Sequence, residues 1–178
     1  MRWWFGLGES VLYLDNLDEG IAYAFSKGIP SRIVSNASWS KGIEKDREYL
    51  LKLKSKGLAE VNISTGDMHQ QFVSIDKVLS VVYAAISINL RAIVYIEKTK
   101  ISKFTLKSLK EHPLYLKIID ADYNNLFTVI SAPWVSINSG NIYEYDEQAF
   151  LEKSRGCDSL YKSVALNPDG NFLSCCGL

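Results

Sequence analysis

The chain has 178 residues, 47% of them hydrophobic, which is enough for a domain with a real core. Its 20 basic and 20 acidic residues give a formal net charge of zero, so charge gives no reason to expect nucleic acid or a membrane surface as a partner. The longest apolar stretches, such as residues 78–90, are too short and too polar to span a bilayer, and the N-terminus has no secretion-signal pattern. We therefore expect a cytoplasmic protein.

The elements predicted along the chain alternate between strand and helix about five times. Short runs rich in β-branched and aromatic residues indicate strands, and apolar residues at helical spacing between capping residues indicate helices. Residues 115–122 fit neither pattern clearly. In chain order, the expected strands are residues 2–7, 32–35, 60–63, 91–97 and 126–131; the expected helices lie between Asp15 and Gly28, over 43–56, through 78–86 and over 102–110.

Such alternation predicts parallel strands joined by right-handed helical crossovers, in either a doubly wound sheet or an incomplete barrel. In both folds, ligands bind at the carboxyl ends of the strands. The ends of these strands carry an unusually polar set of residues, so we expect the functional site there. The set consists of Gly8, Glu9, Ser35, Asn36, Ser64, Thr65, Asp67, His69 and Glu97.

The end of the chain has a different pattern. Residues 164–166 and 171–173 are apolar, and the turn Asn-Pro-Asp-Gly at 167–170 separates them, which predicts a β-hairpin. A boundary near residues 150–155 divides the chain into a first domain of residues 1–150 and a short second one of residues 151–178.

All three cysteines lie in the second domain, where the hairpin would bring Cys157 back toward Cys175 and Cys176. An odd number of cysteines in an intracellular setting makes a disulfide framework a poor interpretation. Clustered thiolates suit an iron–sulfur cluster or zinc, and three buried, incidental thiols are the alternative. A zinc site would need a fourth ligand, and both histidines, His69 and His112, are distant in the sequence.

The spacing from Cys157 through Gly170 to Cys175, with the Cys-Cys-Gly end, resembles the opening of the SPASM domain. That domain carries auxiliary 4Fe–4S clusters in radical S-adenosylmethionine (SAM) enzymes that modify peptides and proteins. The resemblance implies that Cys157, Cys175 and Cys176 are cluster ligands. The family pattern continues with further cysteines, which this sequence lacks.

Several segments of the first domain resemble barrel motifs of the same superfamily. Residues 5–10 are similar to the Gly-Gly-Glu-Pro segment that binds the SAM amino group, and residues 33–39 to the Thr-Asn-Gly segment after the next strand. Residues 61–73 resemble a segment in which an Ile-Ser strand end precedes an Asp, a His and an aromatic. The resemblance implies SAM contacts by Gly8, Glu9, Ser35, Asn36 and Ser64, with Asp67 and His69 at the mouth of the site.

The cysteine motif that defines the superfamily, Cys-x-x-x-Cys-x-x-Cys, is missing, because no cysteine precedes Cys157. The resemblance therefore implies a partial (β/α) barrel of radical SAM type, followed by the start of a SPASM-like domain. We expect a peptide or protein substrate, and a chain that by itself is catalytically incomplete. A fragment, a truncated reading frame and a decayed copy are all open interpretations. An open barrel edge would also favour association with another chain.

Two other classes of protein remain open. One is a non-catalytic scaffold of the same fold that binds a peptide or nucleotide at the polar strand ends. The other is a small zinc-binding α/β protein that uses the tail cysteines, which metal analysis would test.

Overall fold

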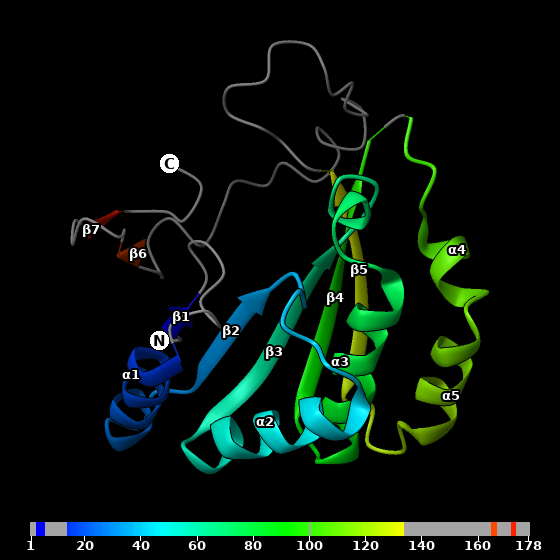
Figure 1. The fold of residues 1–178 in the computed structure, drawn as a ribbon. Coiled ribbons are helices and arrows are strands. Elements are labelled where there is room, and N and C mark those ends of the chain that lie inside the picture. The colour runs from blue at the N-terminus through cyan, green and yellow to red at the C-terminus, as the bar shows by residue number, and fades with distance from the viewer. Residues whose placement is uncertain (1–2, 6–13, 100, 134–164, 167–171, 174–178) are drawn as a thin grey trace.

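The computed structural model describes residues 3–5, 14–99, 101–133, 165–166 and 172–173 (Figure 1). Its main body alternates strands and helices in the expected order. The elements are β1 (Trp3–Phe5), α1 (Leu14–Ser26), β2 (Ser31–Ser35), α2 (Ile43–Ser55), β3 (Leu58–Thr65), the 3-10 turn η2 (His69–Gln71), α3 (Ile75–Ser87), β4 (Arg91–Lys98), α4 (Leu106–Lys110), α5 (Pro113–Ala121) and β5 (Phe127–Pro133).

The five strands form one parallel sheet in the order β1-β2-β3-β4-β5. Each strand is therefore added on the same side of the one before it. A doubly wound sheet reverses this direction, whereas a (β/α) barrel keeps it. The α/β class with a parallel sheet is confirmed, and the described strands follow the consecutive order of a barrel.

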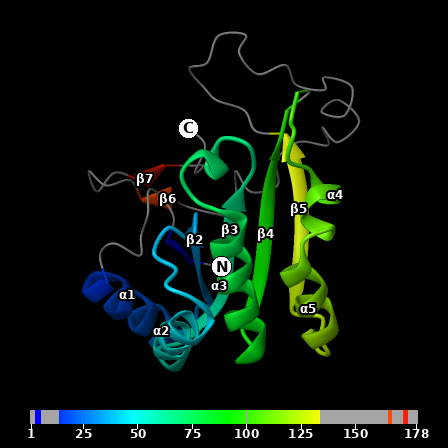
Figure 2. The same ribbon diagram turned by 45° about the vertical axis from the view of Figure 1, so that its right-hand side comes forward.

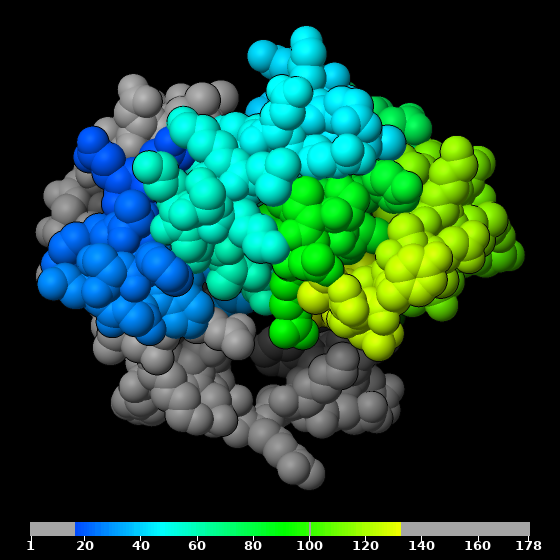
Figure 3. Space-filling view, turned by 90° about the horizontal axis from the view of Figure 1, so that it is seen from below, coloured from blue at the N-terminus to red at the C-terminus, as the bar shows by residue number. Residues whose placement is uncertain are grey.

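The helices pack on one face of the sheet, as right-handed crossovers between consecutive strands require (Figures 1 and 2). Seen from below, the described elements lie side by side in chain order, from α1 in blue through α2 in cyan to α5 in yellow-green (Figure 3). Among the described residues, no helix is long and apolar enough to cross a membrane.

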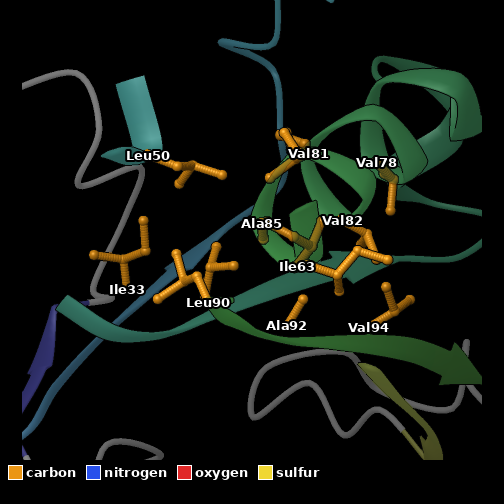
Figure 4. Packing of buried hydrophobic residues seen from close by; sticks show 14 of the residues in the cluster. Ile33, Leu50, Ile63, Val78, Val81, Val82, Ala85, Leu90, Ala92 and Val94 are labelled. Carbon is orange, nitrogen blue, oxygen red and sulfur yellow. The ribbon is translucent and has the colours of Figure 1, made fainter. Parts of the chain in front are cut away.

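An apolar core lies between the helices and the sheet. Helix α3 contributes most to it, because both its sides are covered by α2 and α5. Figure 4 shows its side chains above those of β3 and β4. Each fully buried Val, Leu or Ile stabilises the fold by about 1.5–3 kcal/mol relative to an exposed one. The labelled core residues are Ile33, Leu50, Ile63, Val78, Val81, Val82, Ala85, Leu90, Ala92 and Val94.

The alternate positions of the strands point to the opposite face, which we call the inner face. Near the amino ends of the strands it carries a row of charges, in which Glu60 lies between Arg32 (3.1 Å) and Arg91 (3.7 Å). With its amide oriented to suit both neighbours, Asn62 donates to Glu60 and accepts from Arg32. Glu60 is only 6% exposed, so these contacts compensate a buried charge.

Two predictions for the region after β4 need correction or completion. The helix expected over residues 102–110 begins only at Leu106, because Thr105 is its N-cap and exchanges hydrogen bonds with Ser108. The ambiguous stretch 115–122 is helical. Its helix α5 begins earlier, where His112 caps it and Pro113 takes the first position.

The end of the chain contains a short antiparallel pair, Ala165–Leu166 (β6) with Phe172–Leu173 (β7), as the hairpin prediction requires. Its turn and the cysteines Cys157, Cys175 and Cys176 lie outside the described residues. The SPASM-like character of this segment thus stays a prediction.

Candidate functional site

The carboxyl ends of β2, β3 and β4 meet at one edge of the sheet. In register, Ser35 of β2 pairs with Ile63 of β3, and Thr65 pairs with Ile96 of β4. The structure therefore brings the polar strand ends together, as expected for parallel strands. The sequence-predicted residues along this edge are Ser35, Asn36, Ser64, Thr65, Asp67, His69 and Glu97; Gly8 and Glu9 lie outside the described residues.

The loop after β3 is fixed to the end of β4 by Glu97. This carboxylate accepts the backbone N–H of Met68 at 2.5 Å and lies 2.9 Å from Nδ1 of His69. The Glu97 residue is only 8% exposed, so the carboxylate side of this contact is shielded from water. Histidine and glutamate from two neighbouring strand ends thus form one unit, the Glu97–His69 pair.

Gly66 allows this close approach. It adopts a positive φ of 145°, and a Cβ at this position would overlap the side chain of Glu97. Gly66 was not among the predicted site residues. A glycine directly between a strand end and a polar residue, in Ser-Thr-Gly-Asp, was the available signal.

Asp67 braces the same loop against the segment before α4. Its two carboxylate oxygens accept the backbone N–H groups of Lys103 (2.7 Å) and Phe104 (2.8 Å). A carboxylate oxygen has further lone pairs, but both of these oxygens already have a fixed partner. The structure gives Asp67 a bracing role, and its predicted place at the mouth of a SAM site stays a prediction.

Ser35 and Asn36 organise the loop after β2. The Ser35 hydroxyl accepts the backbone N–H of Ala37 (3.0 Å) and the indole N–H of Trp39 (2.8 Å). Asn36 accepts the N–H of Ser38 at 2.8 Å, an Asx turn. Ser35 is 4% exposed and shares the helix-side face with Ile33, so its predicted contact with a cofactor stays a prediction.

Ser64 has a different environment. It alternates with the helix-facing residues Ile63 and Thr65, so its side chain belongs to the inner face, beside Tyr95 of β4. The residue is half-buried, and no hydrogen bond joins its hydroxyl to the other described side chains or loops. A hydroxyl placed this way can both donate to and accept from a bound molecule.

Within the ranges that the structure describes, no three His, Cys, Asp or Glu residues gather closely enough to hold a metal ion. A scan against protein-family models matches none, and a comparison with curated proteins also finds no match. The site is therefore characterised by its own residues: the Glu97–His69 pair, the Ser64 hydroxyl and the two loops braced by Asp67.

Proposed function

We propose that the chain is part of a radical SAM enzyme with a SPASM domain, acting on a peptide or protein. The observation that supports this most is the arrangement of the strand ends. The segments 35–36, 64–69 and 97 lie along one carboxyl edge of a parallel sheet whose strands follow barrel order. This is the edge at which (β/α) barrels carry their active sites.

The described residues fit SAM in part. Ser64 offers a hydroxyl on the inner face, whereas the side-chain oxygen of Asn36 already accepts the N–H of Ser38. Ser35 and Asp67 are occupied by backbone N–H groups, so they are better suited to hold the loops than to contact the cofactor. SAM bound beside a reduced iron–sulfur cluster supplies radical chemistry, and this chain would contribute orientation of the cofactor and of the substrate.

Anaerobic reconstitution with iron and sulfide tests the iron–sulfur part of this proposal. We expect absorbance near about 400 nm, the region of thiolate–iron charge transfer, in the unaltered chain. The control replaces Cys157, Cys175 and Cys176 together with serine and should lose this absorbance. If both chains show the same spectrum, the cysteines hold no cluster and the proposal loses its iron–sulfur component.

SAM binding is tested separately by following backbone amide NMR signals during titration with millimolar SAM. Signals of Ser64 and its neighbours should move, and Ser64→Ala should weaken binding about 5- to 10-fold, the value of one hydrogen bond. The matched control is Ser55→Ala, at the far end of α2, which should bind as the unaltered chain does. Equal affinity of all three chains would contradict a Ser64 contact.

A second candidate is a non-catalytic binding scaffold of the same fold. The observation that favours it is that Asp67 and Ser35 are both committed to the chain's own backbone N–H groups. Such a scaffold would show no cluster absorbance after reconstitution but would still bind its ligand at the carboxyl edge. The two experiments above therefore distinguish it from an enzyme fragment.

A further inference from the structure

The segment that joins β4 to α4 and continues through that helix is strongly basic. Residues 98–110, which we call the basic segment, contain five lysines and no acidic residue, in a chain whose formal net charge is zero. The structure describes four of these lysines, and all four are exposed: Lys98, Lys103, Lys107 and Lys110. A local positive charge of this size attracts an anionic partner to this part of the surface.

The charge of the basic segment is largely uncompensated within the described part of the chain. Among the described residues, its lysines form one ion pair, between Lys107 and Glu111 at 3.8 Å. Both side chains are mostly exposed, so this pair is weak and Lys107 can exchange it for another carboxylate. In α4, Leu106 and Leu109 pack toward the core, whereas Lys107 and Lys110 are on the outward side of the helix.

The basic segment begins at the carboxyl edge of the sheet. Lys98 is the last residue of β4, and the backbone N–H of Lys103 is bound by Asp67 of the loop after β3 at 2.7 Å. Figures 1 and 2 show the segment running from the end of β4 to α4, on the flank of the molecule away from α1 and α2. The two loops that Asp67 joins also expose bulky apolar side chains, since Ile101 is 77% exposed and Phe72 is 87% exposed.

We propose that the basic segment, together with Phe72, docks an acidic part of the peptide substrate that also carries bulky apolar side chains. Carboxylates of the peptide would pair with the lysines, and its apolar side chains would cover Ile101 and Phe72. A peptide held there has its neighbouring residues at the carboxyl edge, where the site lies. This inference deepens the proposed function, because it rests on a peptide being the substrate and names the class of that peptide.

Two other anionic partners fit the basic segment less well. Nucleic acid is held by many phosphate contacts, but this chain has no net charge and the segment contains no arginine. A membrane surface is bound by amphipathic helices that insert an apolar face, whereas α4 has five residues and turns its leucines toward the core. A short acidic peptide needs only a local cluster of lysines and a few apolar contacts.

Fluorescence anisotropy of labelled peptides tests the proposal with the full, unaltered chain. The probe is four repeats of Glu-Glu-Leu, and its controls are four repeats of Glu-Glu-Ser and four of Lys-Lys-Leu. The probe should bind at least about fivefold more tightly than either control, and raising the salt from about 0.05 M to about 0.3 M should weaken its binding severalfold. Equal binding of the three peptides, no binding of the probe at millimolar concentration, or binding that ignores salt would overturn the proposal.

The other partner classes are measured alongside the probe. Vesicles that contain phosphatidylserine and a single-stranded DNA of similar charge to the probe should bind more weakly than the probe does. Tighter binding of either one would overturn the choice of a peptide as the partner.

Charge-reversal variants locate the contact. The test variant changes three lysines of the basic segment to glutamate, and the matched control makes the same change at three exposed lysines on and around α2. The test variant should bind the probe at least about tenfold more weakly, and the control less than about threefold. Equal weakening would show that net charge rather than this surface attracts the peptide, which would overturn the proposal. The lysines are Lys103, Lys107 and Lys110 in the test variant, and Lys41, Lys45 and Lys56 in the control.

Ile101→Ser tests the apolar part of the docking surface, with Leu51→Ser on α2 as the matched control. Both side chains are exposed in the structure, at 77% and 47%. Ile101→Ser should weaken binding of the probe about threefold, and Leu51→Ser should leave it unchanged. Equal affinity of the two variants would refute the contact with Ile101. If a charge-reversed chain does not fold, the three peptides on the unaltered chain still decide.

These measurements require neither SAM nor iron, so their failure is distinct from failure of the proposed enzyme class. A chain that takes up no cluster can still prefer the acidic, apolar peptide. A chain that assembles a cluster but does not distinguish the three peptides overturns the docking surface alone.

Discussion

Replacing Asp67 with alanine tests whether this carboxylate is a brace. It would remove two hydrogen bonds to a charged acceptor, at 2.7 and 2.8 Å. Such bonds contribute about 1.5–3 kcal/mol each when enclosed, but water can reach the N–H of Lys103 after the change. We therefore expect a loss of about 2 kcal/mol in the free energy of unfolding. For a chain of this size, that corresponds to a Tm lower by about 4–8 °C.

Urea denaturation of Asp67→Ala, with exposed Asp120→Ala as the control, measures this loss. Amide hydrogen exchange locates it: the N–H groups of Lys103 and Phe104 should exchange faster, while those of β3 should stay protected. Unchanged stability together with unchanged exchange at both amides would refute the bracing role. Asp67 would then be available to contact a ligand, as the family resemblance implies.

Three further changes probe the same framework. Gly66→Ala should lower the free energy of unfolding by about 1–3 kcal/mol more than Gly42→Ala does, as measured by urea denaturation. Both glycines have a positive φ, but only at residue 66 would the added Cβ overlap the side chain of Glu97. Equal losses would contradict the close approach of Glu97 to this turn. Asp46→Ala should lower the free energy of unfolding by about 3 kcal/mol in the same assay, because this buried carboxylate accepts from two serine hydroxyls and a backbone N–H. A loss below about 1 kcal/mol would show that these three donors find other partners. Burial raises the pKa of Tyr115 from 10.0, so its neutral form contributes stability that is complete below pH 10.0 and is lost as pH rises through the higher folded pKa. Tyr115→Phe should therefore lose less stability than the unaltered chain between about pH 9 and about pH 11. Parallel profiles of stability against pH for the two chains would refute this.

The strands after α1 could be predicted closely because local pattern and tertiary structure agree there. The runs at 32–35, 60–63 and 91–97 lie within β2, β3 and β4. The start of α4 could not be placed, because residues 103–104 are held by Asp67, a residue far back in the chain. Helix α5 was readable in principle, since His112 followed by Pro113 is a capping signal, but the apolar run after it masked the helical period.

The location of the site followed from topology alone, because parallel strands with helical crossovers must all end at the same edge. The partnership of His69 with Glu97 could not be predicted, since it depends on the register of β3 with β4 and on the turn at Gly66. The orientation of Ser35 was predictable: it lies two residues after Ile33, so both belong to the helix side of the strand. The alternation of side chains along a strand thus distinguishes polar residues on the helix side that hold loops, such as Ser35, from those on the inner face, such as Ser64.

The inner face differs between its two ends in how its charges are compensated. At the amino ends of the strands, Glu60 pairs with Arg32 and Asn62 across two neighbouring strands, and separating such buried partners costs about 3–5 kcal/mol. At the carboxyl ends, Glu97 is instead paired with groups of a loop, His69 and the N–H of Met68. A ligand that enters from the carboxyl edge would have to break the first network to use its charges, whereas the His69 side chain at that edge is already 28% exposed. Recognition is therefore expected from the loops after β3 and β4, and variants that alter specificity should be sought there rather than in the row of charges beneath.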